Sequence, residues 1–318
     1  MKFSVRVNND LPLADYPRLA RAAEVAGFNQ FWVSDDLFWR SALVILSSVA
    51  LATEKIQIGT CIVNPYTLHP AEMAMAAATM DELSGGRFLL GLSSGAGDFL
   101  EWVGIRPEQP LATVRETVAQ LRALWCGAAP DGWAPEARLR FETREIPIYL
   151  GAMSPRMLRL IGEVADGGLP LLFPPEVFGD VLDLIGPLAR DVDIAACIWC
   201  SVSSDRDAAE RVLRDKIAYY GHALSDLILS RLGVERAEFE PIRAAVHAGD
   251  ADRAARLVTP AMLQIGVVGT AADLLPRVQG LVARGARHLS FGPPLGPDPF
   301  DAIETLGRDV LPHFRSAR

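Results

Sequence analysis

The sequence has few residues that could hold a metal ion. Its 318 residues include only four cysteines and five histidines, and no two histidines lie at the short spacing of a zinc site. Cys197 and Cys200 form a Cys-x-x-Cys pair, which occurs in redox and metal sites, but no second ligand pair accompanies it. Because the pair falls within the apolar run from Ile194 to Val202, we interpret both residues as core. We expect no metal site, and metal-dependent hydrolysis is disfavoured.

The chain also lacks a basic cluster and a long apolar run. Lysine and arginine total 31 against 39 acidic residues, which gives a formal net charge of -8. This balance disfavours nucleic acids and acidic membranes as partners. No apolar run reaches the roughly 20 residues of a membrane span, and the first residues have the pattern of a strand rather than of a signal peptide. We therefore expect a cytoplasmic protein that acts on a small molecule.

Apolar and aromatic residues, by contrast, are plentiful. Hydrophobic residues make up 50% of the chain, with 13 Phe and 6 Trp, which is enough to bury a large core. Strand-like and helix-like segments alternate from end to end. The expected strands are residues 2–7, 31–34, 56–62, 88–92, 146–150, 169–173, 194–202 and 288–291. Helices are expected at 15–26, 41–53, 71–83, 155–165, 177–189, 205–220, 272–283 and 300–314.

Eight such units favour a closed (β/α)8 barrel formed by one domain over residues 1–318, because closure buries both faces of a parallel sheet and leaves no edge. The alternative is an open, doubly wound sheet. Against it, no Gly-x-Gly-x-x-Gly follows the first strand, where the residues run from Val7 to Pro12. Residues 222–268 are charged and helical with no obvious strand, so they are expected to form an insertion before the last unit, as a lid, a subunit contact or a plain helical pair.

Glycines follow four of the expected helices, at Gly27, Gly85 and Gly86, Gly167, and Gly285. We expect each to form a left-handed helix cap. Polar residues gather elsewhere, in the stretch from Ile56 to Pro70, which begins as a strand and turns at an Asn-Pro-Tyr sequence. Those side chains should lie at the carboxyl end of a buried strand, where barrels bind their ligands.

Five stretches carry a pattern that is recognisable in this order. They are Asn64–Pro70, Asp81–Arg87, Ile146–Ala152, Ala165–Gly167 and Phe291–Asp298. Together they resemble the luciferase-like superfamily of flavin and deazaflavin enzymes. Within it the sequence is most similar to the methylenetetrahydromethanopterin reductase branch, which uses the deazaflavin coenzyme F420.

The resemblance implies an F420 site at the carboxyl ends of the strands. In the family, the third strand carries a non-prolyl cis peptide beneath the coenzyme ring, and the matching bond here is Cys61-Ile62. Asn64 matches a position that hydrogen-bonds the pyrimidine edge of the ring, although an Asx turn before Pro65 explains it too. The positions carried over as coenzyme contacts are Cys61, Ile62, Asn64, Ser93, Ser94, Gly95, Gly151, Ala152, Met153 and Ser154.

Two of these stretches have chemistry that suits a coenzyme. The loop from Leu92 to Asp98 has small residues and free amides, which permit close approach of a ligand but also occur in any flexible loop. The stretch from Gly151 to Pro155 ends a strand and opens a helix, and its amides suit the phospholactyl tail of F420. Ser154 is equally explained as a helix N-cap.

Three positions depart from the family. Arg6 stands where the reductases have a carboxylate, Asp36 where relatives typically have His, and Ala96 where they have an acidic residue, so a pterin substrate is disfavoured. Asp35 and Asp36 could raise one carboxyl pKa towards neutrality, or could be a solvated loop or N-cap. We expect Asp36 to transfer a proton and Arg6 to orient an anionic substrate group or to pair with Asp36.

The favoured function is therefore an F420-dependent oxidoreductase. It would transfer a hydride to or from a C=C, C=N or carbonyl/alcohol carbon of a small or secondary-metabolite substrate. An FMN-dependent luciferase-like monooxygenase is the first alternative, and a non-catalytic flavin-binding barrel is the second. The resemblance and apolar helical stretches such as Ala71–Ala78 also predict a homodimer.

Overall fold

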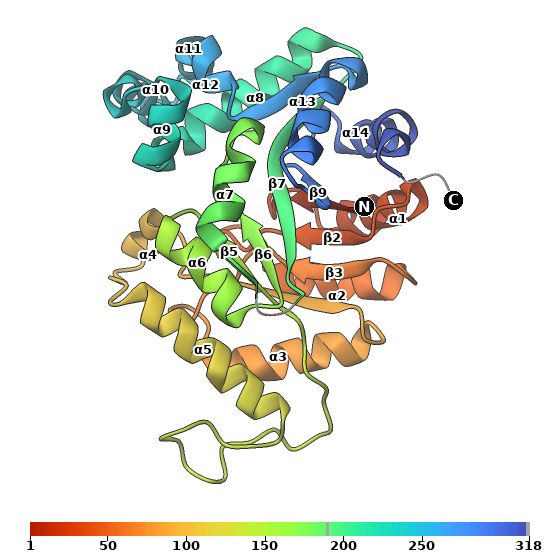
Figure 1. Cartoon of the computed structure of the whole chain (residues 1–318), viewed down its shortest axis with the longest axis vertical. Coiled ribbons are helices and arrows are strands. Elements are labelled where there is room, and N and C mark those ends of the chain that lie inside the picture. Colours follow the sequence, from red (N-terminus) through yellow and green to blue (C-terminus); the bar gives the residue numbers. More distant parts are fainter. Residues whose placement is uncertain (189–190, 316–318) are drawn as a thin grey trace.

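Eight parallel strands form a closed barrel in the computed structural model, which describes residues 1–188 and 191–315 (Figure 1). Pairing runs in order from β1 to β7, then to β9, which pairs back with β1. The eight barrel strands are β1 (Lys2–Val7), β2 (Gln30–Val33), β3 (Gln57–Thr60), β4 (Phe88–Leu92), β5 (Ile148–Ala152), β6 (Gly167–Pro170), β7 (Asp193–Val202) and β9 (His288–Phe291). A further strand, β8 (Gly266–Gly269), pairs with the end of β7. The (β/α)8 barrel expected from the sequence is confirmed.

Helices surround the barrel and follow its strands (Figure 1). They are α1 (Asp15–Ala26), α2 (Ala42–Ala52), α3 (Pro70–Leu83), α4 (Gly97–Trp102), α5 (Pro110–Trp125), α6 (Pro155–Val164), α7 (Phe178–Ile185), α8 (Arg206–Tyr220), α9 (Asp226–Leu232), α10 (Glu240–His247), α11 (Ala251–Leu257), α12 (Pro260–Leu263), α13 (Ala271–Ala283) and α14 (Pro299–Thr305). Among residues 1–188 and 191–315, no helix has both the length and the apolar character that a membrane crossing requires.

Side chains alternate between two cores along each strand, as the pleat of a β-strand dictates. In β1, Phe3, Val5 and Val7 pack in the large core between the strands and the helices. The residues between them face the barrel interior, where a smaller apolar cluster lies. That cluster consists of Trp32, Leu89, Tyr149, Leu169, Ala195 and Cys197. Cys197 and Cys200 are both buried with free thiols. Cys197 packs in the interior cluster and Cys200 in the large core, in agreement with their interpretation as core residues.

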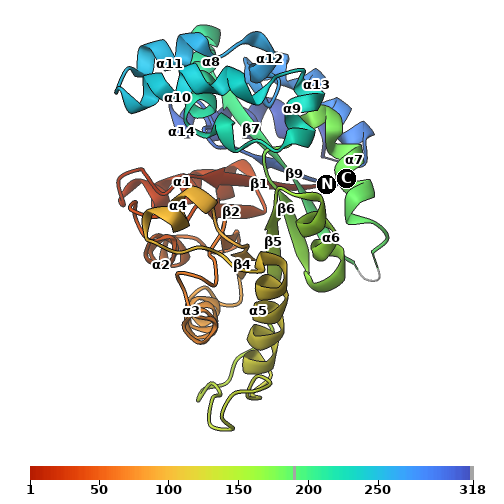
Figure 2. The ribbon, with the colours of Figure 1, turned by 90° about the vertical axis from the view of Figure 1, so that its left-hand side faces the viewer.

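The insertion lies between α8 and β8 and packs on the outer side of α8. It consists mainly of α9 to α12, at the far end of the molecule from the long loop that follows α5 (Figure 2). The expectation that residues 222–268 contain no strand was wrong, because β8 begins at Gly266 and pairs with the last four residues of β7. Its short sequence, Gly-Val-Val-Gly, is too brief to give a periodic signal.

Most of the glycine caps were correctly placed. Gly27, Gly85, Gly86 and Gly285 all have positive φ at or just beyond a helix end. Gly167 is the exception, since it lies within β6 and α6 ends in extended backbone at Ala165. The space around it explains the residue, because a Cβ atom there would lie 2.2 Å from the Tyr149 ring. Close approach of that ring, rather than a left-handed cap, requires glycine.

Candidate active site

A cavity of about 320 Å³ opens at the carboxyl ends of β2, β3, β4 and β5. All ten positions that the resemblance carried over to the coenzyme line it, and so does Asp36. The remaining lining residues are Asp35, Leu37, Ala96, Phe99, Leu100, Met157 and Leu171. The positions expected from the sequence therefore come from four separate βα loops, which is the usual construction of a barrel ligand site.

The segment after β3 forms one wall of this cavity. The Cys61-Ile62 peptide bond is cis, as the resemblance implied. Asn64 is buried, and its Oδ1 atom accepts hydrogen bonds from the backbone N–H groups of Tyr66 and Thr67 at 3.1 Å each. The Asx turn is therefore real. It fixes the Asn64 side chain while leaving the Nδ2 donor without a hydrogen bond to any residue in the described part of the chain.

The loop after β4 and the end of β5 meet across the cavity. The Ser93 hydroxyl donates to the carbonyl oxygen of Gly151 at 2.8 Å, which ties the two strands together. Gly95 has φ +79°, and a Cβ atom there would lie 3.1 Å from the Asn64 side chain. At Gly151 a Cβ atom would lie 3.1 Å from Ile62. Glycine at both positions keeps the lining thin and open to a flat ligand.

The far end of the cavity is the start of α6. Ser154 caps this helix, because its side chain accepts a hydrogen bond from the Met157 N–H at 3.4 Å, and Pro155 occupies the first turn. Unpaired amides of a helix start carry partial positive charge. The N-cap explanation of Ser154 thus holds in the structure, and it is compatible with an anion lying against the same amides.

Two neighbouring carboxylates lie at the mouth, with different surroundings. Asp35 accepts a hydrogen bond from the Ala42 N–H at 3.0 Å, and burial, aided by the charge of Asp36, raises the pKa of Asp35. Asp36 accepts a 2.6 Å hydrogen bond from the Tyr220 hydroxyl. The expectation that one pKa of the pair is raised is met, and Asp35 is the residue concerned.

Sequence reasoning missed the two residues of α8 that face this mouth. Lys216 donates to Asn8 Oδ1 at 3.2 Å, and its ammonium lies 4.0 Å from the centre of the Tyr220 ring. Burial lowers the pKa of Lys216 to about 8, against the opposing effect of the Asp36 and Asp10 charges. The available signal was spacing, since residues four apart share one helix face and Ile217 beside them is buried.

Arg6 does not line the cavity, in contrast to the role expected for it. It is 4% exposed inside the barrel, where Nε donates to Ser290 Oγ at 3.1 Å and Nη2 donates to the Ile198 carbonyl at 2.8 Å. The Arg6 charge also lowers the pKa of the Cys61 thiol, against the larger effect of burial. No ion pair joins Arg6 to Asp36 or to another carboxylate of the described residues. Arg6 therefore lies beneath the cavity rather than beside its ligand.

Trp32 also lies inside the barrel and does not line the cavity. It is fully buried, and its ring centre lies 5.0 Å from that of Tyr149. Phe38 and Trp102 are 71% and 60% exposed, with ring centres 6.2 Å apart. Of the aromatic residues near the mouth, Phe99 lines the cavity and contacts Trp102.

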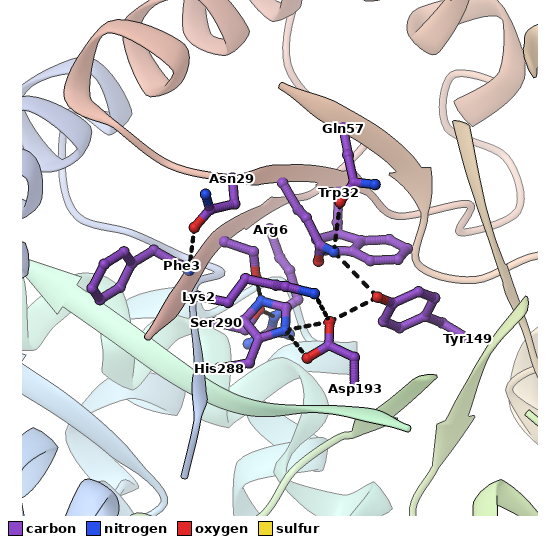
Figure 3. A network of polar contacts seen from close by, with 12 residues as sticks. Lys2, Phe3, Arg6, Asn29, Trp32, Gln57, Tyr149, Asp193, His288 and Ser290 are labelled. Atoms are coloured by element: carbon purple, nitrogen blue, oxygen red, sulfur yellow. Dashed lines mark hydrogen bonds and ion pairs between the residues drawn. The ribbon is translucent and has the colours of Figure 1, made fainter. Parts of the chain in front are cut away.

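A second polar cluster occupies the opposite, amino-terminal end of the barrel (Figure 3). His288 contacts Asp193 through Nδ1 at 3.1 Å and Ser4 through Nε2 at 2.8 Å, while Lys2 and Tyr149 donate to the same carboxylate. This Ser-His-Asp order matches that of a hydrolase, but Ser4 and His288 are 0% exposed. Because no substrate can reach the hydroxyl group, we assign the cluster to stability.

Burial and charge set the titration of this cluster. Burial by itself raises the pKa of Asp193, but hydrogen bonds and charges of His288 and Lys2 outweigh it and hold that pKa well below its usual range. Burial lowers the pKa of His288, against the opposing effect of the hydrogen bond and charge of Asp193.

Comparisons with known proteins agree with this geometry. The 5,10-methylenetetrahydromethanopterin reductase of Archaeoglobus fulgidus is 32% identical over 99% of this chain and 100% of its own. The enzyme of that name from Methanolobus tindarius is 30% identical over 98% and 100%. The solved coenzyme F420-dependent tetrahydromethanopterin reductase of Methanopyrus kandleri superposes with a TM-score of 0.89 at 27% identity, covering 99% of each chain. A family described as luciferase-like monooxygenase matches residues 1–288. The chain therefore belongs to the luciferase-like monooxygenase family.

Proposed function

We propose that this protein is an F420-dependent oxidoreductase that transfers a hydride between the deazaflavin and a small-molecule substrate. The observation that carries the proposal is that all ten expected coenzyme positions line one cavity. Relatives that are at least 30% identical over nearly the whole chain are named as reductases of a methanopterin substrate, and the solved structure of one such reductase is named as F420-dependent.

The residues present fit a deazaflavin. Ile62, Met157 and Leu171 give the cavity an apolar surface for a planar ring, and Gly95 and Gly151 leave the space that a Cβ atom would occupy. The amides at the start of α6 suit an anionic tail. When bound, the coenzyme supplies the carbon that accepts or donates the hydride.

Proton transfer falls to Asp36 and Tyr220 in this proposal. The Tyr220 hydroxyl donates to Asp36, so its oxygen lone pairs are left to accept a proton from an O–H or N–H group of the substrate. In the oxidising direction, Tyr220 gains that proton as it passes its own to Asp36. Lys216 lies over the Tyr220 ring, where its charge stabilises electron density on the phenol as the proton leaves.

An FMN-dependent monooxygenase is the competing function, because the matching family is described by that reaction. A binding titration separates the two. We expect the protein to bind F420 at least tenfold tighter than FMN, a difference of about 1.4 kcal/mol. Equal affinities, or tighter binding of FMN, would contradict hydride transfer with F420. Binding of either ligand without any turnover would favour the non-catalytic flavin-binding barrel.

Exposed apolar side chains on two neighbouring helices support a homodimer. Val44 and Leu51 on α2 are 60% and 75% exposed, and Met75 on the adjacent α3 is 47% exposed. Such large apolar side chains on two neighbouring helices are characteristic of an interface rather than of a solvated face. We propose that α2 and α3 of two copies pack together, a refinement of the role expected for Ala71–Ala78.

A further inference from the structure

Arg6 is a buried cation close to the floor of the cavity. It lies near the carboxyl end of β1, opposite Trp32 of β2 in the strand register, and its side chain enters the barrel interior. Its hydrogen bonds to Ser290 and to the Ile198 carbonyl, on β9 and β7, fix the guanidinium in one place. Neutral acceptors satisfy its donors, but they do not cancel its charge.

No carboxylate of the described residues lies within ion-pair distance of Arg6. A buried arginine is normally paired with an acidic group, because an unpaired charge in the interior is costly. The titratable groups whose pKa the Arg6 charge influences are three thiols, one imidazole and one ammonium, and none of them is a carboxylate. They are Cys61 beyond β3, Cys197 and Cys200 of β7, His288 of β9 and Lys216 of α8.

Cys61 connects this charge to the cavity. The Cys61 N–H donates to the carbonyl oxygen of Val33 on β2 at 2.7 Å, one residue along from the Trp32 that lies opposite Arg6, and Cys61 is part of the cavity lining. Burial raises the pKa of the Cys61 thiol to about 12, and the Arg6 charge acts against that rise. The positive potential of Arg6 is therefore felt at the cavity floor, where the surrounding protein screens it far less than water does.

Asp36 is the acidic group that opposes this potential. It lines the cavity mouth, and its charge raises the pKa of Cys61 whereas the charge of Arg6 lowers it. Its carboxylate accepts a hydrogen bond from Tyr220 of α8. Asp35 lies beside it, where burial raises its pKa and the Ala42 N–H donates to its carboxylate. The floor of the cavity is thus positive and its mouth negative.

We propose that Arg6 is an electrostatic positioning residue that stabilises the anionic form of the deazaflavin ring held in the cavity. The inference rests on the proposed function, since it takes F420 as the ligand. It replaces the role first expected for Arg6, because the guanidinium contacts neither the cavity nor anything placed in it. Its effect would be to set the electronic state of the ring, which is how a protein charge tunes a bound cofactor.

The test is a spectroscopic titration that needs no substrate. The ring hydroxyl of oxidised F420 ionises with a change in visible absorbance, which can be followed against pH in the complex. We expect the pKa of bound F420 to rise by about one unit or more in Arg6→Gln, a tenfold change in proton affinity. Arg6→Lys, which keeps the charge but loses the planar fork, should remain close to the wild type.

Two further variants keep the result interpretable. Arg6→Met removes the charge and fills similar volume with an apolar chain, so it serves if the glutamine variant misfolds. Arg243→Gln removes an exposed arginine on α10 and should leave the titration unchanged. An unaltered pKa in folded Arg6→Gln or Arg6→Met, with F420 still bound, would overturn the inference. If FMN proves the tighter ligand, the proposed function fails, and titration of the FMN N3 proton in the same variants still decides the role of Arg6.

Discussion

At the scale of single residues, the contact that matters most for the proposed chemistry joins positions far apart in the chain. Tyr220 and Asp36 are 184 residues apart, and their 2.6 Å hydrogen bond forms only because α8 packs over the loop after β2. Burial, together with the charge of Asp36, raises the pKa of Tyr220, so the phenol keeps its proton at neutral pH. It can therefore pass a proton but does not lose one at rest.

Asp36→Asn removes the group that accepts this proton. We expect turnover to fall by about 10²- to 10⁴-fold, as for a lost general acid or base, while F420 affinity stays nearly unchanged. Tyr220→Phe should cause a loss of similar size, and the double variant should lose little more than either single one, because both serve one transfer. Steady-state kinetics and coenzyme titration measure the two effects. Full turnover of Asp36→Asn across the pH range would exclude this role and direct attention to Asp98, Glu101 or Tyr66.

At the scale of elements, glycines in and after β4 and β5 shape the cavity, because they have no side chain to fill its space. Gly151 closes β5 and faces Ile62 and Ser93 at distances that leave little room for a side chain. Gly97, at the start of α4, has nothing within 4 Å of the place where its Cβ atom would lie. The two glycines therefore offer a matched pair.

Gly151→Ala should weaken F420 binding by roughly tenfold or more, because the added methyl group presses on the cavity lining. Gly97→Ala should leave binding within about twofold of the wild type, since alanine favours the helix and meets no neighbour. Isothermal titration of both variants provides the comparison. Equal losses in the two would mean that general loop stiffness, rather than space at Gly151, controls coenzyme binding.

At the scale of the whole molecule, the polar cluster at the amino-terminal end of the barrel links stability to pH. The folded pKa of His288 lies below its unfolded value, so the unfolded chain takes up the proton first and stability is lost as pH falls below about 6.5. The folded pKa of Asp193 is also lowered, and its contribution is lost further down, as pH falls below about 4. Both effects have the same sign.

Urea unfolding should therefore show a midpoint that falls between about pH 7.5 and about pH 5.5. His288→Gln should be less stable at the higher pH, because it loses contacts to Ser4 and Asp193, but its stability should vary less across this range. A midpoint with the same pH dependence in both proteins would show that other groups control acid unfolding.

Assembly is the second property of the whole molecule. Leu51→Glu places a charge in the exposed apolar face of α2 and should shift the protein from dimer to monomer in light scattering at micromolar concentration. Val103→Glu alters another exposed apolar residue, in the turn after α4, and should leave the mass unchanged. A monomeric wild type would contradict the proposed dimer outright.

The sequence by itself determined the barrel, and its resemblance to a known family identified the residues that line the cavity. Alternating strand and helix patterns are local, and a parallel barrel gathers the carboxyl ends of its strands at one face whatever the details of packing. The loops at Asn64, Gly95 and Gly151 could therefore be placed together from residue type and order. Recognition of the family added the Cys61-Ile62 cis bond, which residue chemistry alone does not predict.

Tertiary structure decided which long side chains meet. Arg6 looked free to bind substrate, but the pleat of β1 turned it into the barrel interior, beneath Cys61 and away from Asp36. Lys216 and Tyr220 looked like ordinary residues of an amphipathic helix until the packing of α8 brought them to Asn8 and Asp36. Such pairings depend on how elements hundreds of residues apart are set against one another, and no local pattern encodes that placement.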